Sequence, residues 1–368
     1  MKVIAQINAL QEALTLAGSI VATRTPKPVL QCVKLVAAEN VLTLMATDLE
    51  AGCRYQVTAV KVEEEGEALV PAARLTGIVR ESAGEESLVL ETEKESCIVR
   101  GSGSRFTVFG YDPAEYPAVA EFVDPADFAI PAATLGEMIN KTLFATAKTH
   151  SHYAMAGILC EASGKKLSLV ATDGHRLAQA KGSLKKSAGR DVTAIVPTKL
   201  MALIQRVAGE GDGEELLEVK VLENQILVRT ARSVLVSSLV QGNFPRYADV
   251  IPKECDKKAT INTQQFEHRV RQAALLTDEQ SRSVKLSFRP DQAVLTSRTP
   301  EAGDAEVTCP LKYEGEPVDI GFTPTFLIDA LRVAGAEEIS FEMSAGNKPA
   351  VLKAGPNFLY VLMPVDLG

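Results

Sequence analysis

Apolar residues recur at intervals of three and four in three well-separated segments, and each segment follows a short strand-like stretch. This spacing places the apolar side chains on one face of a helix. The predicted helices cover residues 8–24, 133–149 and 263–276. Leu10, Leu135 and Phe266 hold matching places in them, 125 and 131 residues apart, so the pattern indicates an internal repeat.

A second helix is predicted behind a proline in each third of the chain. Pro71, Pro197 and Pro324 are separated by 126 and 127 residues. Proline suits the start of a helix, because its missing N–H would have no partner there anyway. The helices predicted from these starts cover residues 72–82, 198–208 and 325–334.

Alternating apolar and polar positions between the helices predict strands. Leu42–Asp48 matches Leu167–Asp173, which lies 125 residues later. Ala293–Arg298 holds the corresponding place in the last third of the chain, without the aspartate. Each third closes with a further strand pair, such as Val219–Leu222 and Ile226–Thr230.

Together these patterns predict three modules that each run strand, helix, several strands, helix, several strands. Such an order favours an α+β fold with helices on one face of antiparallel sheets. Shifts in proline content and charge at Pro113–Pro125 and Ile251–Lys257 indicate linkers. The predicted modules are therefore residues 1–122, 123–252 and 253–368.

Composition agrees with a globular protein. The 368 residues are 46% hydrophobic and 23% charged, which excludes disordered and collagen-like chains and favours two or three domains. The N-terminus lacks the long apolar run of a signal peptide, and no run of about 18 apolar residues is present to span a membrane. The expected location is the cytoplasm.

The cysteines give no sign of a disulfide or zinc framework, because no two of them are close enough to form a CxxC pair. We expect them to be small core residues in a reducing compartment, and we expect no metal or cofactor. The six cysteines are Cys32, Cys53, Cys97, Cys160, Cys255 and Cys309.

The formal net charge of -8 argues against a simple basic nucleic-acid binder. The predicted helices, however, contain ten basic and five acidic residues, a net charge of +5, which leaves -13 for the rest of the chain. If the helices share one surface, that surface attracts phosphate while the remainder repels it. The alternative is that these cations belong to ordinary solvated helix faces.

The octapeptide Ala171–Ala178 (ATDGHRLA) is the most distinctive of four motifs in the chain. It resembles the signature of one family, the β sliding clamp of bacterial DNA polymerase III, and the resemblance covers the whole chain, including its length and triplication. The other matching segments are Tyr360–Leu367, Val240–Pro245 followed by Tyr247, and Ser104–Phe106.

The resemblance implies a fold of three tandem DNA-clamp modules, with two helices per module inside and antiparallel sheets outside, in a head-to-tail dimeric ring. It implies a non-catalytic accessory subunit of the DNA polymerase III holoenzyme: a processivity factor that encircles double-stranded DNA and slides without sequence specificity. The implied partners are the polymerase III α subunit, the clamp-loader δ subunit, repair polymerases, mismatch repair proteins and ligase.

The resemblance also implies a groove for partner peptides. An apolar strand that ends in Met-Pro beside a Gly-His-Arg turn is consistent with an apolar slot that has a few polar anchors. Two departures, Asp366 and Ser281, are expected to shift peptide preference without removing the groove. The implied groove residues are Met155, Thr172, Gly174, His175, Arg176, Leu177, Pro245, Val250, Val361, Leu362, Met363, Pro364 and Val365.

For contacts with the DNA backbone, the resemblance implies Arg24, His152, Tyr153 and Lys199. His152 stands where an arginine is more usual in the family, which matters because histidine is largely neutral at pH 7. For the ring interface we expect contacts between the first module of one subunit and the last module of the other. The candidates are Phe106 and Val108 against Leu275 and Leu276, with Arg74, Arg100 and Arg105 against Glu301, Asp304 and Glu306.

Two other readings use the same residues. Asp173 and His175 could form an acid–base pair of a hydrolase, although Asp173-Gly174 is also ordinary turn chemistry and no serine or cysteine motif stands nearby. Alternatively, the chain could be a protein-interaction hub that does not encircle DNA.

Overall fold

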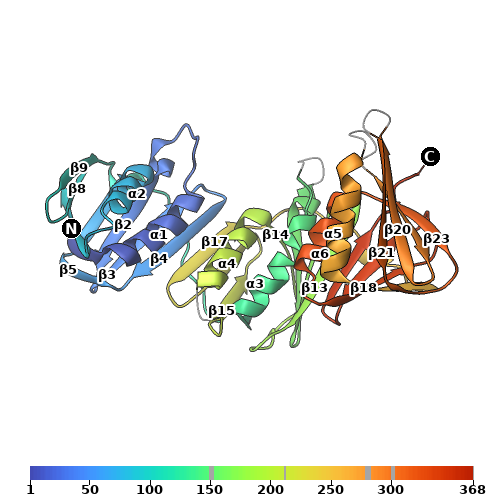
Figure 1. Cartoon of the computed structure of the whole chain (residues 1–368). Coiled ribbons are helices and arrows are strands. Elements are labelled where there is room, and N and C mark those ends of the chain that lie inside the picture. The colour runs from blue at the N-terminus through green and yellow to red at the C-terminus, as the bar shows by residue number, and fades with distance from the viewer. Residues whose placement is uncertain (149–152, 211–212, 278–282, 300–302, 368) are drawn as a thin grey trace. The chain divides into compact units, whose positions relative to one another are not determined.

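The computed structural model describes residues 1–148, 153–210, 213–277, 283–299 and 303–367 (Figure 1). The predicted order of strand, helix, strands, helix, strands is confirmed in all three thirds of the chain. The helices are α1 (Ile7–Ile20), α2 (Ala72–Glu81), α3 (Ala132–Asn140), α4 (Thr198–Glu210), α5 (Thr263–Ala273) and α6 (Pro324–Val333). None of the helices in these ranges is both long and apolar enough to cross a lipid bilayer.

The chain divides into two compact units rather than three. The first unit comprises Met1–Ala133, Lys185–Arg190 and Lys199–Leu239, and the second comprises Thr134–Leu184, Asp191–Thr198 and Val240–Gly368. This division differs from the repeat because strands from successive thirds share one sheet. The predicted module boundaries near residues 122 and 252 stay a prediction.

The first unit contains two antiparallel sheets. In spatial order, the five-stranded sheet is β5 (Val60–Glu64), β1 (Lys2–Gln6), β7 (Ser87–Glu93), β8 (Ser96–Arg100) and β9 (Arg105–Phe109). The eight-stranded sheet is β10 (Phe128–Pro131), β15 (Leu216–Val221), β16 (Gln225–Arg229), β17 (Ser233–Ser238), β4 (Ala51–Val57), β3 (Val41–Thr47), β2 (Cys32–Ala38) and β6 (Gly66–Pro71).

The second unit also contains two antiparallel sheets. The nine-stranded sheet is β14 (Val192–Pro197), β11 (Gly157–Ser163), β12 (Lys166–Thr172), β13 (Arg176–Ser183), β26 (Phe358–Leu362), β25 (Ala350–Ala354), β24 (Glu338–Met343), β18 (Lys257–Asn262) and β22 (Lys312–Glu314). The four-stranded sheet is β21 (Gly303–Pro310), β20 (Gln292–Thr299), β19 (Val284–Arg289) and β23 (Val318–Phe322).

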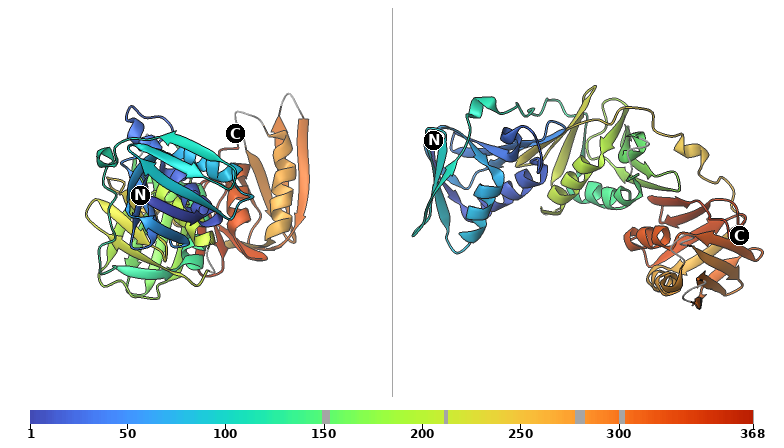
Figure 2. Two further views of the ribbon diagram at one scale, coloured as in Figure 1. Left: turned by 90° about the vertical axis from the view of Figure 1, so that its left-hand side faces the viewer. Right: turned by 90° about the horizontal axis from the view of Figure 1, so that it is seen from above.

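Paired helices cover a sheet face in each unit. In the first unit α1 lies beside α2, and it buries Leu10 and Leu14 completely (Figure 1). In the second unit α5 lies beside α6, with Phe266 and Leu327 fully buried, and the views in Figure 2 agree on this arrangement. The apolar stripes read from the sequence are therefore the core faces of the helices.

Three predicted helices were too long by three residues or more. The first ends at Ile20 rather than residue 24, because Pro26 and Pro28 lack N–H groups and disfavour helical geometry in the residues before them. The third ends at Asn140 rather than residue 149. There the hydroxyl of Thr142 donates to the Met138 carbonyl at 2.9 Å, in place of a continuing backbone hydrogen bond. The helix predicted to 276 ends at Ala273 and continues as the 3-10 turn η6 (Ala274–Leu276).

These shorter helices weaken the predicted charge contrast. Within the observed bounds the six helices contain seven basic and six acidic residues, a net charge of +1 instead of +5. The difference arises mainly because Arg24, Lys141 and Lys148 lie outside the observed helices. The positive charge counted for the predicted helices is therefore smaller within the observed bounds, since three of the cations lie in the segments that follow the helices.

The turn between β3 and β4 is held by its own side chains. The Asp48 carboxylate accepts hydrogen bonds from the Glu50 and Ala51 N–H groups, at 3.0 and 2.8 Å. The Thr47 hydroxyl donates to the Ala51 carbonyl at 2.8 Å and accepts from the Leu49 N–H at 3.0 Å. This geometry requires a φ of +80° at Leu49, a conformation that a leucine rarely adopts.

Replacing Leu49 with glycine is expected to stabilise the first unit by about 1 kcal/mol, because glycine adopts positive φ without strain. Urea unfolding followed by circular dichroism measures the change. Glu50→Gly, in the same turn but without a positive φ, is the matched control and is expected to destabilise. An equal loss of stability in both variants would show that the turn stores no strain at Leu49.

Candidate functional site

The turn between β12 and β13 repeats the hydrogen bonds of the first module. The Asp173 carboxylate accepts from the His175 and Arg176 N–H groups, both at 3.0 Å. The Thr172 hydroxyl donates to the Arg176 carbonyl at 2.7 Å and accepts from the Gly174 N–H at 3.2 Å. Gly174 holds the positive-φ position, with φ of +90°, where the first module has leucine. The matching segments of the sequence therefore fold into the same turn.

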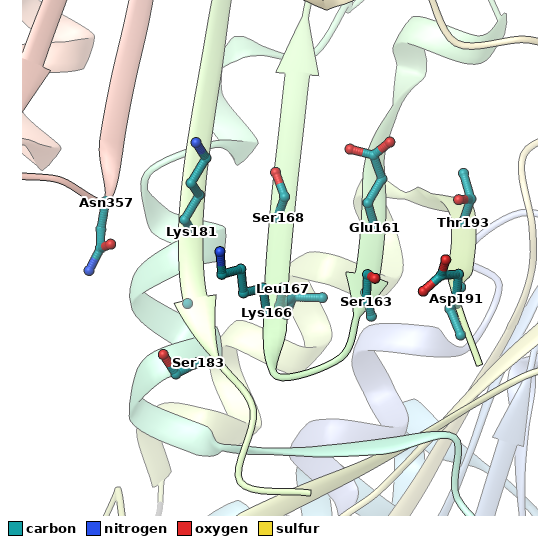
Figure 3. Close-up of a pocket in the computed structure, with 13 residues that line it drawn as sticks. Glu161, Ser163, Lys166, Leu167, Ser168, Lys181, Ser183, Asp191, Thr193 and Asn357 are labelled. Carbon is teal, nitrogen blue, oxygen red and sulfur yellow. The ribbon is translucent and has the colours of Figure 1, made fainter. Parts of the chain in front are cut away.

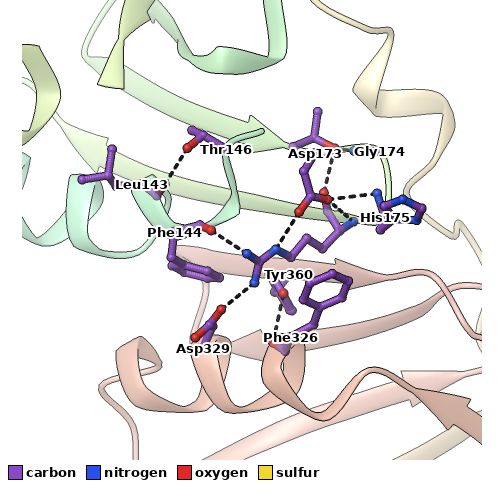
Figure 4. Close-up of polar contacts among 11 residues, drawn as sticks. Leu143, Phe144, Thr146, Asp173, Gly174, His175, Phe326, Asp329 and Tyr360 are labelled. Carbon is purple, nitrogen blue, oxygen red and sulfur yellow. Dashed lines mark hydrogen bonds and ion pairs between the residues drawn. The ribbon is translucent and has the colours of Figure 1, made fainter. Parts of the chain in front are cut away.

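The Arg176 side chain is buried, and three of its nitrogens donate hydrogen bonds. Figure 4 labels its partners Asp173, Asp329 and Phe144. Its Nε donates to the Asp173 carboxylate at 3.0 Å, and its Nη1 donates to the Asp329 carboxylate at 2.7 Å. Its Nη2 donates to the Phe144 carbonyl, also at 2.7 Å. The guanidinium also lies 4.4 Å from the ring centroid of Phe326. Arg176 thus links the β13 turn to α6, which begins 148 residues later in the sequence.

Burial opposes the charge of this guanidinium, but its hydrogen bond to Asp329 and the nearby Asp173 carboxylate hold the pKa of Arg176 above its ordinary value. Beneath it, the Tyr360 hydroxyl donates to the Phe326 carbonyl at 3.0 Å. Burial raises the pKa of Tyr360, so this phenol stays protonated. The network is satisfied internally and leaves Arg176 little capacity to bind a ligand.

A small apolar groove opens beside this turn, and Arg176 is one of the residues that line it. Its floor comes from Leu177 and Val361, which are directly paired between β13 and β26. The ladder continues past β26, because the Met363 N–H donates to the His175 carbonyl at 2.9 Å. The eleven lining residues are Met155, Thr172, Gly174, Arg176, Leu177, Pro245, Arg246, Tyr247, Val250, Val361 and Met363.

The segment 240–252 forms one wall of this groove. Val240, Phe244, Tyr247 and Ile251 pack on an apolar cluster of the sheet that includes Leu177 and Val361. The groove has a volume of about 150 Å³, which is below the roughly 300 Å³ at which pockets begin to hold drug-sized molecules. It therefore fits one or two apolar side chains of a longer ligand.

Comparison with known proteins agrees with this geometry. The chain matches the family models of all three domains of the DNA polymerase III beta subunit. The N-terminal domain matches residues 1–120, the central domain residues 129–246 and the C-terminal domain residues 248–366. The Beta sliding clamp of Pseudomonas aeruginosa is 31% identical over 98% of this chain and 99% of its own length. That of Escherichia coli K12 is 30% identical over 94% of each.

The chain belongs to the family of bacterial β sliding clamps, the β subunits of DNA polymerase III. Solved structures agree over the full length of both chains. The sliding clamp of Bacillus subtilis superposes with a TM-score of 0.95 at 25% identity. The Pseudomonas aeruginosa clamp bound to griselimycin superposes with a TM-score of 0.94 at 30% identity.

Nine of the thirteen groove residues expected from the sequence line the observed groove. His175, Leu362, Pro364 and Val365 do not. Leu362 is fully buried on the other face of β26, because successive residues of a strand point to opposite faces. Val365 instead bridges to Gly321 of β23. Strict alternation along the last strand could have separated Val361 and Met363 from Leu362.

Arg246 and Tyr247 also line the groove, although sequence analysis gave them no role there. Tyr247 belongs to a segment whose sequence resembles that of the family. Its packing on the apolar cluster of the sheet is what reveals that it forms part of the groove wall.

The acid–base pair of Asp173 and His175 is not formed. Asp173 accepts three hydrogen bonds from His175 and Arg176, and the contribution of His175 is its backbone N–H rather than its imidazole. The carboxylate is occupied in shaping the turn, so the hydrolase alternative has no geometric support at these residues.

The structure places two of the four residues expected to contact DNA. Arg24 is exposed in the loop after α1. Lys199, at the start of α4, forms an ion pair with Asp48 and donates to the Ile20 carbonyl at 3.3 Å. Burial alone would raise the pKa of Asp48, but hydrogen bonds from Lys199 and from backbone N–H groups outweigh it. The pKa of Asp48 therefore lies below its ordinary value, and the pair stays ionised. His152 lies outside the described residues, and of Tyr153 only the backbone is described, in the 3-10 turn η4 (Tyr153–Ala156).

The interface candidates divide between the two units. On the edge strand β9, Arg105 and Phe106 are exposed, whereas Val108 is buried within the first unit. Arg74 is exposed on α2, and Arg100 is already paired with Glu91 at 2.9 Å. In the second unit Leu275 is 79% exposed, Leu276 is half-buried, and Asp304 and Glu306 are exposed on the edge strand β21. Glu301 lies outside the described residues.

Arg176→Ala is expected to destabilise the second unit by about 2–4 kcal/mol, because it leaves two carboxylates near the core without their cation. Urea unfolding measures this loss. The control, Arg271→Ala, removes an exposed ion pair with Glu267 and is expected to cost less than about 1 kcal/mol. Equal effects of the two substitutions would contradict a stabilising role for the buried network.

Proposed function

We propose that the groove between β13, β26 and segment 240–252 binds short apolar peptide segments of replication and repair proteins. The observation that carries the proposal is the groove itself: an apolar floor of Leu177 and Val361 with exposed apolar rims at Val250 and Met363. Met363 is 40% exposed and Val250 is 47% exposed, so both can lose apolar surface on binding. Methionine adapts to side chains of different shape, which suits several partners.

The partners proposed for this groove are those that the family resemblance implies: the polymerase III α subunit, the clamp-loader δ subunit, repair polymerases, mismatch repair proteins and ligase. Competition for one groove would let them act in turn. Arg246 adds a positive charge at the rim, which favours peptides with an acidic residue beside the apolar anchor.

As a sliding clamp subunit the chain serves processivity rather than chemistry, and we propose that it is non-catalytic. The Asp173 carboxylate supports this, because it already accepts three hydrogen bonds from His175 and Arg176 within the turn. We propose that Arg24 contacts DNA phosphates, since it is exposed in a loop. Lys199 contributes less, because Asp48 already balances its charge.

We propose a head-to-tail dimer closed by pairing β9 of one subunit with β21 of another. The internal repeat supports this pairing. The last strand of the middle module, β17, pairs with β4 of the first module, and the last strand of the third, β26, pairs with β13 of the middle one. In both junctions the last strand of one module pairs with a strand of the module before it. If the junction is repeated once more, β9, the last strand of the first module, pairs with the edge strand β21 of a second copy.

The surfaces of these two strands support the same pairing. Phe109 and Phe106 on β9 are 79% and 40% exposed, an unusual amount of aromatic surface for an edge strand. Arg105 on β9 and the acidic Asp304 and Glu306 on β21 have complementary charges. Heterologous contacts of this kind close into a ring when the rotation between subunits permits.

Deletion of Met363–Gly368 is expected to weaken peptide binding at least tenfold, because it removes the Met363 rim and the ladder contact to His175. Surface plasmon resonance with polymerase III α subunit measures this loss. Griselimycin, which the Pseudomonas aeruginosa clamp binds, is expected to compete with the α subunit for the intact chain. Full α-subunit binding by the truncated chain would refute the groove assignment.

Leu275→Asp is expected to convert the dimer into a monomer, because it places a charge on an apolar side chain that is 79% exposed beside the proposed interface. Sedimentation velocity measures the oligomeric state. Leu222→Asp, at a leucine 37% exposed in the loop between β15 and β16, is the matched control and should remain a dimer. A dimeric Leu275→Asp variant would reject this interface.

A further inference from the structure

One hydrogen bond joins the wall of the groove to the polar part of the same sheet. The Tyr247 hydroxyl donates to a carboxylate oxygen of Glu161 at 2.7 Å. Tyr247 lies in the 3-10 turn η5 (Tyr247–Asp249) of the wall, and Glu161 lies on β11. Tyr247 lines the groove, whereas Glu161 does not.

The strand registers explain why a carboxylate stands at this place. Leu159 and Glu161 project from the same face of β11, since they are two residues apart. Leu159 belongs to the apolar cluster beneath the wall, and Glu161 is the first polar residue beyond that cluster. Across the strands Glu161 pairs with Thr193 on β14 and with Ser168 on β12. The edge of the apolar cluster therefore coincides with Glu161.

Beyond that edge, the sheet face forms an open cavity of about 600 Å³ that is lined mostly by polar residues (Figure 3). In Figure 3, Glu161, Ser168, Lys181 and Thr193 lie side by side across adjacent strands. The Glu161 carboxylate thus faces Tyr247 on one side and a wide, solvated cavity on the other.

The tyrosine ring is held in part by apolar packing. It lies half-buried on the cluster of the sheet and edge-on to Phe244, with ring centroids 6.4 Å apart. Burial, and then the hydrogen bond and charge of Glu161, raise the pKa of Tyr247 to about 12. The phenol therefore remains a hydrogen-bond donor throughout the neutral pH range.

Few other polar contacts hold this wall. The Val240 N–H donates to the Ile195 carbonyl at 2.9 Å, at the beginning of the segment. The hydrogen bonds of Tyr247, Asp249 and Val250 backbone N–H groups stay within the segment. Among the described residues, the Tyr247–Glu161 bond is the one hydrogen bond that ties residues 241–252 to the sheet.

We propose that Glu161 is a positioning residue for the groove, which acts through Tyr247 without touching the bound peptide. By anchoring the phenol, it orders the wall before a ligand arrives, so that binding does not have to order it. This inference rests on the peptide-binding function proposed above. Hydrogen bonds to charged acceptors are stronger than neutral ones, and ordering a loop on binding lowers affinity.

The test measures the affinity of the full-length protein for polymerase III α subunit and, separately, for griselimycin. Glu161→Ala and Tyr247→Phe are each expected to lower affinity about three- to tenfold. The double variant is expected to lose no more than either single variant, because both remove the same bond. Glu161→Gln keeps a hydrogen-bond acceptor and should recover part of the affinity.

Thr193→Ala is the matched control, because Thr193 lies opposite Glu161 in the same cavity, and among the described residues the hydroxyl of Tyr247 is bonded to Glu161 rather than to Thr193. It should bind like the unmodified protein. Sedimentation velocity and urea unfolding check that the variants remain dimeric and folded. If Glu161→Ala does not fold, the affinities of Tyr247→Phe and Glu161→Gln decide the question.

The outcomes separate this inference from the function on which it rests. If the unmodified protein binds neither probe, the peptide-binding proposal fails. If it binds them and Glu161→Ala binds within twofold, the positioning role is wrong. If the losses of the two single variants add in the double variant, Glu161 acts by a route other than Tyr247, and the inference is also overturned.

Discussion

The pairing of strands from successive modules is the constraint on which the rest of the structure depends. β17 completes a sheet with β4, and β26 completes one with β13, so each internal junction is a continuous antiparallel ladder. Unpaired edge strands offer a row of N–H and C=O groups to any matching strand. The five-stranded and four-stranded sheets each contain strands of one module and end in β9 and β21. We propose that a second copy repeats the same junction at these two edges.

The apolar groove is a consequence of one of these junctions. Its floor exists because β13 and β26 pair side by side, which brings Leu177 against Val361. Beside the groove, Arg176 holds the turn of one module to Asp329 of the next. The groove therefore forms only when the last module is docked, and its walls are stabilised by side chains far apart in the sequence. Tyr247 then closes it from a segment that has few other polar contacts with the sheet.

Local patterns were sufficient to predict the order of elements, because apolar periodicity and prolines act within a few residues. They failed at helix ends, where the Thr142 hydroxyl decides the outcome. The octapeptide was sufficient to identify the turn and most of the groove, through a family resemblance. It could not reveal that the Arg176 guanidinium is buried, because Asp329 lies 153 residues away. Nor could charge counting reveal that Lys199 is balanced by Asp48, since that contact depends on the tertiary fold.

The most direct test of the account is the retention of this protein on DNA after loading by a clamp loader. If the edges β9 and β21 close two subunits into a ring, the protein should stay on a nicked circular duplex at moderate salt and leave when the circle is cut once. Enclosure depends on topology, whereas binding to phosphates does not. Equal retention on circular and linear DNA, or failure to remain on either, would contradict the proposed ring.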